Sequence, residues 1–434
     1  MKNDNFNRGL LKFLDASPTP FHCVANLAAA LSGANFVELD EGAIWSIEAP
    51  GKYFVTRGDS SLIAFSLGST PVGETGFRMV GSHTDSPCLK LKPNVALASS
   101  GYWQLGVEVY GSALLNPWFD RDLSVAGRVT LQTASGKLQN HLIDFEQSIA
   151  IIPSLAIHLD RDANNKREIN SQTDLPPIVC LDGRELDLAQ EIKNRLYASE
   201  SELGEIEIIS FDLSLYPTEP AAMIGLRHEF IASARLDNLL SCYAGLCALL
   251  EASETDNCLI VCNDHEEVGS GSAIGARGTF LRSVLDRITE NNETFSRTIM
   301  RSIFISTDNA HGVHPNFPSS HDKQHSPSLN SGPVIKFNSN QAYASTGETA
   351  AMFQQACTAV GIPVQNFVSR SDMACGSTIG PLTATALGVK TVDVGVPTFA
   401  MHSIRELAGS KDTYSLYQAL CWIFGQREQM PNNL

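Results

Sequence analysis

CLIVCNDHEEVGS, residues 258–270, joins a continuous apolar run to a cluster of acidic and imidazole side chains. The run Cys258–Cys262 is typical of a strand that is buried on both faces of a sheet. The polar cluster after it contains two adjacent glutamates, Glu266 and Glu267. In open α/β sheets, functional side chains gather beyond the carboxyl ends of the strands. The segment therefore predicts an α/β sheet with a functional site at the end of this strand.

Four other segments carry the same kinds of side chain, and most of them also follow a predicted buried strand. They are GSHTDSP (81–87), RLDNLL (235–240), STDNAHGVHPNF (306–317) and PTFAMHS (397–403). Together with residues 258–270, the segments offer five metal-binding side chains: His83, Asp237, Glu267, Asp308 and His402. Two further carboxylates lie close to them in the sequence, Asp85 and Glu266.

Imidazole nitrogen and carboxylate oxygen are ligands that zinc accepts. Two ions about 3.5–4 Å apart need one bridging carboxylate and two terminal ligands each. The five side chains supply this number if Asp237 bridges the ions and the other four are shared between them. Asp85 is then available to orient His83, and Glu266 is available as a general base that takes a proton from water. The pattern favours a metallohydrolase.

Each piece alone has a simpler interpretation. An HxD pair is often a surface or packing pair, and adjacent glutamates often form a solvated face. Asp237 is also a good helix N-cap, Asp308 could cap a turn, and His402 could be a hydrogen-bonded core histidine. The metal site is therefore predicted from the combination of segments and from their order.

Composition limits the possible partners and compartments of the 434-residue chain. Its formal net charge is −16, which disfavours nucleic acids and anionic membranes and means that an acidic substrate would need a local cation. No run approaches the roughly 18 apolar residues of a membrane span, and no secretory apolar segment is visible at the start. The ten cysteines form no CxxC pair, which favours reduced thiols in a cytoplasmic protein.

The chain pattern predicts two domains. Residues 1–92 and 233–434 contain helical segments and buried strands, including a helical face after Asp237, and form one discontinuous α/β domain. Residues 93–232 contain alternating, strand-like segments interrupted by turns, and they supply none of the five predicted ligands. We expect them to form an inserted, mostly β domain.

The motifs resemble those of the aspartyl aminopeptidase family of zinc exopeptidases, from about Phe21 to the predicted C-terminal helix. The segments that carry this resemblance are SHTDSPCLKLKP, SARLDNL, DHEEVGS, STDNAHGVHPNF, GPVIKFN, CGSTIGP and AMHSIRE. The resemblance implies an α/β fold with a mixed central sheet flanked by helices and an inserted β-rich dimerisation domain. It also implies a tetrahedral homododecamer built from dimers.

The family's site roles match residues of this chain one by one. His83, Asp237, Glu267, Asp308 and His402 match metal ligands, Glu266 matches the base, and Asp85 matches the residue that supports the first histidine. Among the substrate-binding positions, Lys336 matches a lysine that faces an acidic side chain. His158 matches a histidine offered by a neighbouring subunit. Tyr343 and Gly376 are further candidates for the substrate site.

The expected function is release of N-terminal Asp, and less readily Glu, from peptides with a free N-terminus. The expected cofactor is two zinc ions, for which manganese or cobalt could substitute. The alternatives are a broad or neutral-residue aminopeptidase on the same di-zinc site, a non-catalytic metal-stabilised binding or shell protein, and an amidohydrolase or deacylase.

Overall fold

The computed structural model describes residues 2–182, 186–199, 204–253 and 255–425, and it groups them into two compact units. The first unit combines the described residues up to Asp85 with Ala221–Met401 and with those from Glu406 onward. The second unit contains the described part of Ser86–Pro220 and the short segment His402–Arg405. A discontinuous unit and an inserted one therefore alternate along the chain.

The unit boundaries lie earlier in the chain than the expected limits at residues 92/93 and 232/233. Strand β5 (Cys88–Ser99) pairs with two strands of the second unit, so the inserted unit already begins at Ser86. Strands β11 (Ala222–Ile224) and β12 (Phe230–Ser233) pair within the first unit, which therefore resumes at Ala221. The two sets of limits differ because strand pairing, on which the units depend, involves residues distant in sequence.

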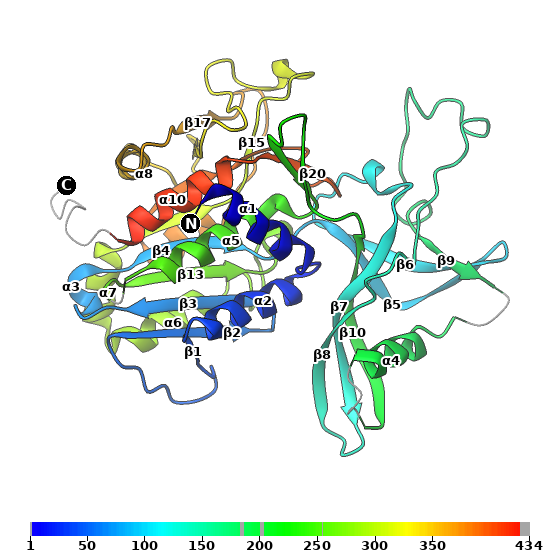
Figure 1. The fold of residues 1–434 in the computed structure, drawn as a ribbon, viewed down its shortest axis with the longest axis horizontal. Helices are drawn as coiled ribbons and strands as arrows, with labels where there is room; N and C mark the ends of the chain where they lie inside the picture. Colours follow the sequence, from blue (N-terminus) through cyan, green and yellow to red (C-terminus); the bar gives the residue numbers. More distant parts are fainter. Residues whose placement is uncertain (1, 183–185, 200–203, 254, 426–434) are drawn as a thin grey trace. The chain divides into compact units, whose positions relative to one another are not determined.

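A nine-stranded mixed sheet forms the centre of the first unit, in the order β1-β2-β3-β13-β4-β14-β18-β16-β17 (Figure 1). In chain order, its strands are β1 (Val37–Glu38), β2 (Gly51–Arg57), β3 (Ser61–Leu67), β4 (Arg78–His83), β13 (Cys258–Asn263), β14 (Ile303–Thr307), β16 (Val334–Phe337), β17 (Gln365–Val368) and β18 (Lys390–Gly395). This mixed sheet with its covering helices confirms the predicted α/β class.

Four neighbouring strands of this sheet run parallel. Strand β4 pairs in parallel with β13 and β14, and β14 pairs in parallel with β18. Every residue of β4, β13 and β14 is buried, as expected for strands covered on both faces. Because parallel strands end at the same edge, the segments that follow these four strands meet there.

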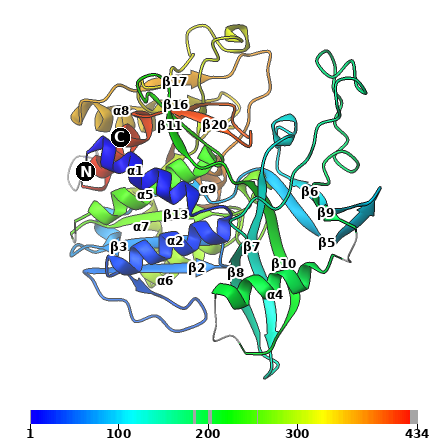
Figure 2. The same cartoon turned by 45° about the vertical axis from the view of Figure 1, so that its right-hand side comes forward.

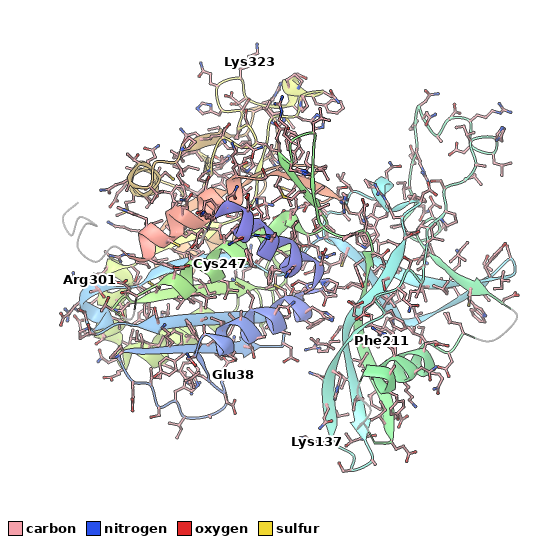
Figure 3. All side chains as sticks on the ribbon, viewed as in Figure 1. Glu38, Lys137, Phe211, Cys247, Arg301 and Lys323 are labelled. Carbon is pink, nitrogen blue, oxygen red and sulfur yellow. The ribbon has the colours of Figure 1, made fainter. Side chains whose placement is uncertain are left out.

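Helices cover both faces of the nine-stranded sheet, and each face has its own apolar core (Figure 1). One core packs α1 (Asn3–Asp15), α2 (Pro20–Gly33), α5 (Leu236–Glu251), α8 (Gly347–Ala359) and α10 (Asp412–Phe424) against the strands. The other contains residues of α6 (Phe280–Thr289), α7 (Asn292–Arg301) and α9 (Ile379–Leu387). In the side-chain view, Cys247 marks α5 (Figure 3).

A smaller five-stranded sheet completes the first unit, in the order β11-β12-β20-β19-β15. Its remaining strands are β15 (Ala310–His311), β19 (Pro397–Phe399) and β20 (Glu406–Gly409). The short helical segments of this unit are α3 (Val72–Thr75), η2 (Glu266–Val268) and η3 (Pro318–Ser320). Across the described ranges, no helix has both the length and the apolar character needed to cross a membrane.

The second unit is built on a six-stranded sheet in the order β8-β7-β10-β5-β6-β9, and neighbouring strands in it are antiparallel. Figure 2 shows its long strands β7 and β10 side by side, with helix α4 next to them. Besides β5, its elements are β6 (Tyr102–Tyr110), η1 (Asn116–Trp118), β7 (Leu123–Thr133), β8 (Leu138–Asp144), β9 (Ile178–Leu181), α4 (Leu188–Ser199) and β10 (Ile206–Pro217). It has its own apolar core, which includes Trp118.

Candidate metal centre

Three of the predicted ligands stand where parallel strands of the large sheet end. His83 is the last residue of β4, and Asp308 directly follows β14. Glu266 and Glu267 begin the single turn η2, which comes two residues after β13. The sheet topology thus collects side chains that are far apart in the sequence at one edge, as the sequence pattern predicts.

The chain turns sharply after β13. His265 has left-handed backbone angles, with φ 63°, and its Nδ1 lies 2.8 Å from Ser272 Oγ. The amide of Asp264 donates a 2.8 Å hydrogen bond to Ser61 Oγ on the neighbouring strand β3. These contacts anchor both ends of the turn that carries the two glutamates.

Asp237 is held at the beginning of α5 by two polar contacts. Its amide donates a hydrogen bond to Glu406 Oε2 at 2.9 Å, and the next residue, Asn238, donates from Nδ2 to the carbonyl of Thr307 at 2.8 Å. Neither Asp237 nor Asn238 has helical backbone angles. The contact with Thr307, the last residue of β14, ties this helix start to the strand end that precedes Asp308.

The imidazole of His83 lies at the centre of the carboxylate cluster. Its Nε2 is 3.5 Å from Asp237 Oδ1, 3.8 Å from Asp308 Oδ1 and 4.0 Å from Glu266 Oε2. Potential ligand atoms of His83, Asp237 and Asp308 lie within 4.8 Å of one another, and so do those of His83, Glu266 and Glu267. The described part of the first unit therefore brings together four of the five predicted ligands and the predicted base.

Asp85 holds the two sides of this cluster in place. Its Oδ1 and Oδ2 accept hydrogen bonds, both 3.1 Å long, from the backbone amides of Glu266 and Glu267. His83 Nδ1 lies 3.0 Å from the Asp85 carbonyl oxygen and 3.3 Å from Asp85 Oδ1. Because Asp85 contacts the Nδ1 side of the ring, Nε2 faces the other carboxylates, as in histidines that bind metals.

The clustered acids disfavour one another's ionisation. Burial raises the pKa of Glu266 to about 7, and the charges of Asp308, Asp85 and Asp237 act in the same direction while His83 opposes them. Burial and the neighbouring Asp237 raise the pKa of Glu267 well above its usual range. Burial opposes protonation of His83, but its contacts with Asp237, Asp308 and Asp85 prevail and raise its pKa. The cluster therefore favours a bound cation.

The residues present fit zinc. Carboxylate oxygens and one imidazole nitrogen converge, and the second ring nitrogen of that imidazole is engaged by Asp85. A divalent cation among these oxygens would offset the repulsion that raises the carboxylate pKa values. Without a metal ion, the pKa of Glu266 is raised to about 7; a bound cation would lower it, so that the ionised carboxylate could accept a proton.

His402, the fifth predicted ligand, lies in the four-residue segment that groups with the second unit. Its Nδ1 is 3.1 Å from the carbonyl oxygen of Ser112, and its own carbonyl accepts a hydrogen bond from the amide of Leu114. The expected domain limits instead place His402 with the catalytic residues. The difference arises because this loop, which connects two strands of the first unit, has its contacts with residues of the second.

Lys336 on β16 is buried next to the metal cluster. Its Nζ is 3.6 Å from Asp308 Oδ2 and donates a 3.2 Å hydrogen bond to the carbonyl of Asn309. The ammonium group also lies 5.0 Å from the centre of the Tyr343 ring, a separation compatible with a cation–π interaction. The structure thus brings two predicted substrate residues, Lys336 and Tyr343, close to the ligand Asp308.

Gly376 lines a cavity of about 300 Å³ in the first unit. His311 lines the same cavity, and its ring packs edge-on against Phe367 at 5.8 Å. Burial and then the charge of Lys336 lower the pKa of His311, which favours a neutral imidazole. The charge of Lys336 therefore acts on a side chain, His311, that lines this cavity.

His158 is exposed in a loop of the second unit, in a turn after Pro153. Three large apolar side chains near it in the sequence are also exposed: Leu155 by 58%, Ile157 by 47% and Leu159 by 75%. His158 is thus not one of the residues that the structure gathers in the first unit.

The sequence patterns did not identify several residues that support the site. Glu406 accepts the amide hydrogen of Asp237, and Cys242 on α5 donates through its thiol to the carbonyl of His83 at 3.0 Å. The sequence offers one indication of Glu406, which is an isolated acidic residue four positions after His402. Its burial, with 2% of the residue exposed, is visible only in the folded structure. Cys242 has no such signal, because it reads as one more apolar residue of a helical face.

The comparisons with known proteins cover nearly the whole chain. Residues 13–424 match the model of the family described as aminopeptidase I zinc metalloprotease (M18). The probable M18 family aminopeptidase 2 of Ectopseudomonas mendocina (strain ymp) is 56% identical over 422 residues, which covers 97% of this chain and 98% of the relative.

Solved structures agree with this assignment. The chain in a cryo-EM structure of an Ape4 and Nbr1 complex is 37% identical with a TM-score of 0.94, covering 97% of this chain and 86% of that chain. The S. cerevisiae mApe1 dodecamer is 27% identical with a TM-score of 0.84, covering 97% and 96%. The ligand cluster, the sheet that builds it and these similarities agree: the chain belongs to the M18 family and is a zinc-dependent aminopeptidase.

Proposed function

We propose that this aminopeptidase releases N-terminal acidic residues, Asp in preference to Glu, from peptides with a free N-terminus. The observation that carries the proposal is Lys336, a buried cation 3.6 Å from Asp308 Oδ2 at the metal cluster. The chain has a net charge of −16, so an acidic side chain needs a local positive group to bind. An ammonium group can donate three hydrogen bonds; Lys336 donates one to the carbonyl of Asn309 and forms an ion pair with Asp308, so it could also bind a substrate carboxylate.

The contacts of Lys336 also support a second function, a broad or neutral-residue aminopeptidase. In this reading, Lys336 serves only as the counter-ion of Asp308 and as a donor to Asn309. The two functions differ in one testable property. Substrate choice depends on the charge of Lys336 in the acidic-residue aminopeptidase but not in the neutral-residue aminopeptidase.

Replacing Lys336 by Ala should reduce the ratio of Asp-peptide to Leu-peptide cleavage by at least about tenfold, because a buried charge pair contributes more than about 1.4 kcal/mol. The ratio of kcat/KM values for two peptides that differ only in the first residue measures this effect, and zinc content shows whether Asp308 still binds metal. Lys137→Ala, at an exposed lysine labelled in Figure 3, is the control. An unchanged ratio would favour the neutral-residue aminopeptidase.

We propose that two metal ions bind and that His83, Asp237, Glu267, Asp308 and His402 would hold them. The bound ions would polarise the scissile carbonyl and lower the pKa of a bound water. Glu266 accepts the proton of the attacking water at Oε2, the oxygen nearest His83, and returns it to the leaving amine. Asp85 keeps Glu266 in position through the backbone amide of that residue.

Glu266→Gln should lower kcat by about 10²- to 10⁴-fold, the usual contribution of a general base, and leave zinc content unchanged. Steady-state kinetics and elemental analysis of the same preparation separate the two effects. The control is Glu290→Gln, which changes an exposed glutamate outside the cluster. Near-normal turnover by a zinc-loaded Glu266→Gln enzyme would assign the base elsewhere.

Zinc binding to the metal-free protein should release protons near pH 7. The pKa of Glu266 is raised to about 7 and that of Glu267 is raised well above its usual range, so part of the cluster is protonated at neutral pH before metal binds. Metal binds the deprotonated ligands, so apparent zinc affinity should rise with pH through this range. Calorimetry in two buffers of different ionisation enthalpy gives the proton number and, from the stoichiometry, the expected two ions. Equal heats in both buffers would contradict the predicted proton release. The same titration with manganese and cobalt tests whether these ions also bind.

We propose further that the chain assembles into a homododecamer built from dimers and that His158 serves the active site of a neighbouring subunit. A related enzyme, S. cerevisiae mApe1, is described as a dodecamer. The exposed loop that carries His158 also presents Leu155, Ile157 and Leu159, and a cluster of exposed apolar side chains is typical of a contact surface. The second unit would then be the dimerisation domain.

If His158 acts between subunits, mixing two inactive variants should restore activity. His158→Ala subunits keep Glu266, and Glu266→Gln subunits keep His158, so a mixed assembly contains sites that have both groups. Refolding equal amounts of the two variants together should recover up to roughly a quarter of wild-type turnover by random pairing, whereas each variant alone stays inactive. Mass measurement in solution checks the assembly. Failure of complementation in intact mixed dodecamers would contradict a role for His158 in the site of a neighbouring subunit.

The proposed compartment is the cytoplasm. All ten cysteines lie within the described ranges and are free thiols, and six of them are buried. Unpaired thiols are typical of proteins from reducing compartments.

A further inference from the structure

Asp393, in the middle of strand β18, is a fully buried carboxylate that has no part in the proposed ligand set. Desolvation of such a group is costly unless hydrogen-bond donors surround it. Burial raises its pKa, while Lys336, Thr378 and the amide of Ala344 act in the opposite direction. The location of these donors, rather than the titration of the acid, indicates its role.

The first partner of Asp393 is the loop between β16 and α8. Asp393 Oδ2 accepts a 2.6 Å hydrogen bond from the amide of Ala344, the residue next to Tyr343. The backbone of Asp393 is tied to the same loop, because its amide donates to Ser345 Oγ at 2.9 Å. Asp393 thus fixes the segment from which the Tyr343 ring faces Lys336.

The second partner is the loop that leads into α9. Asp393 Oδ1 accepts a 2.6 Å hydrogen bond from the hydroxyl of Thr378, the residue that caps this helix. The first turn of the helix lies directly on the carboxylate, since a Cβ atom at Gly380 would be 2.4 Å from Asp393 Oδ1. A helix N-terminus favours a negative charge at this place. The loop held in this way includes Gly376, which lines the 300 Å³ cavity.

Lys336 connects the two loops to the metal cluster. The charge of Lys336 acts on Asp393, and its Nζ is 3.6 Å from Asp308 Oδ2, so one buried cation serves two buried carboxylates. Asp393 itself accepts a hydrogen bond from each loop, through Oδ2 from the Tyr343 loop and through Oδ1 from the Gly376 loop.

We propose that Asp393 is a positioning residue that fixes both substrate loops, those of Tyr343 and Gly376, relative to Lys336 and so determines how tightly the enzyme binds the N-terminal residue of its substrate. This inference rests on the proposed function, because it takes these loops as the walls of the substrate site. The role needs no contact between Asp393 and the peptide. Loss of the Asp393 carboxylate should therefore change KM more than kcat.

The test compares Asp393→Asn with Asp412→Asn. Asp412 is a matched control because it is also fully buried and accepts two backbone amide bonds, from Asn330 at 2.5 Å and Gly332 at 2.9 Å, outside the site. In Asp393→Asn, the amide group can accept from only one of the two loops. The variant should raise KM about tenfold, with kcat within about threefold and zinc content unchanged. Asp412→Asn should lower only the thermal midpoint.

Thr378→Val supplies a second variant if Asp393→Asn does not fold, since it removes only the hydroxyl that binds Asp393. It should also raise KM, and Thr378→Ser, which keeps the hydroxyl, should restore KM towards the wild-type value. An unchanged KM in both Asp393→Asn and Thr378→Val, with activity lost only in proportion to folded protein, would overturn the proposal.

The experiment uses whichever peptide the wild-type enzyme cleaves, Asp- or Leu-initiated. Failure of acidic specificity therefore appears in the wild-type substrate ratio. Failure of the positioning role appears in the KM of the variants, so the two results are distinguishable.

Discussion

Repulsion among buried carboxylates is the constraint on which the site depends. Asp237, Asp308, Glu266 and Glu267 face one buried imidazole, and no stable fold would collect these charges without a strong compensating interaction. Backbone amides from the turn after β13 neutralise part of the charge by binding Asp85. A metal ion offsets the remainder. The zinc requirement of the family therefore follows from the way the strand ends are arranged, because the protein alone provides too few positive groups at this edge.

The sequence predicted those parts of the fold and site that follow from local pattern. The apolar runs before His83, Glu267 and Asp308 become buried strands, and their polar residues meet because parallel strands share an edge. Asp393 escaped prediction for the opposite reason: in TVDVG it is a single polar residue within an apolar strand, and its partners Ala344 and Thr378 come from loops distant in sequence. The unit boundaries at Ser86 and Ala221 likewise depend on long-range strand pairing.

Under the proposed function, the charge of Lys336 serves both structure and specificity. The buried ammonium group of Lys336 has one acidic and one carbonyl neighbour, Asp308 and Asn309, which offset the cost of its burial. The same neighbours reduce the field that it could exert on a substrate carboxylate. Acidic specificity would thus depend on how strongly the ammonium group of Lys336 interacts with the substrate carboxylate relative to the predicted metal ligand Asp308. Neighbouring loops that altered this balance would change the substrate preference while leaving the metal centre the same.

The order of strands in the central sheet has a consequence for the time at which the enzyme becomes active. Strand β4, which carries His83, ends at residue 83, but its two neighbours are β13 (Cys258–Asn263) and β14 (Ile303–Thr307). During translation, β4 has neither partner until the whole inserted unit and much of the C-terminal half have been made. A nascent or truncated chain therefore cannot assemble the metal centre. Proteolytic competence is confined to nearly complete polypeptides, because the strands that assemble the centre end only at residue 395.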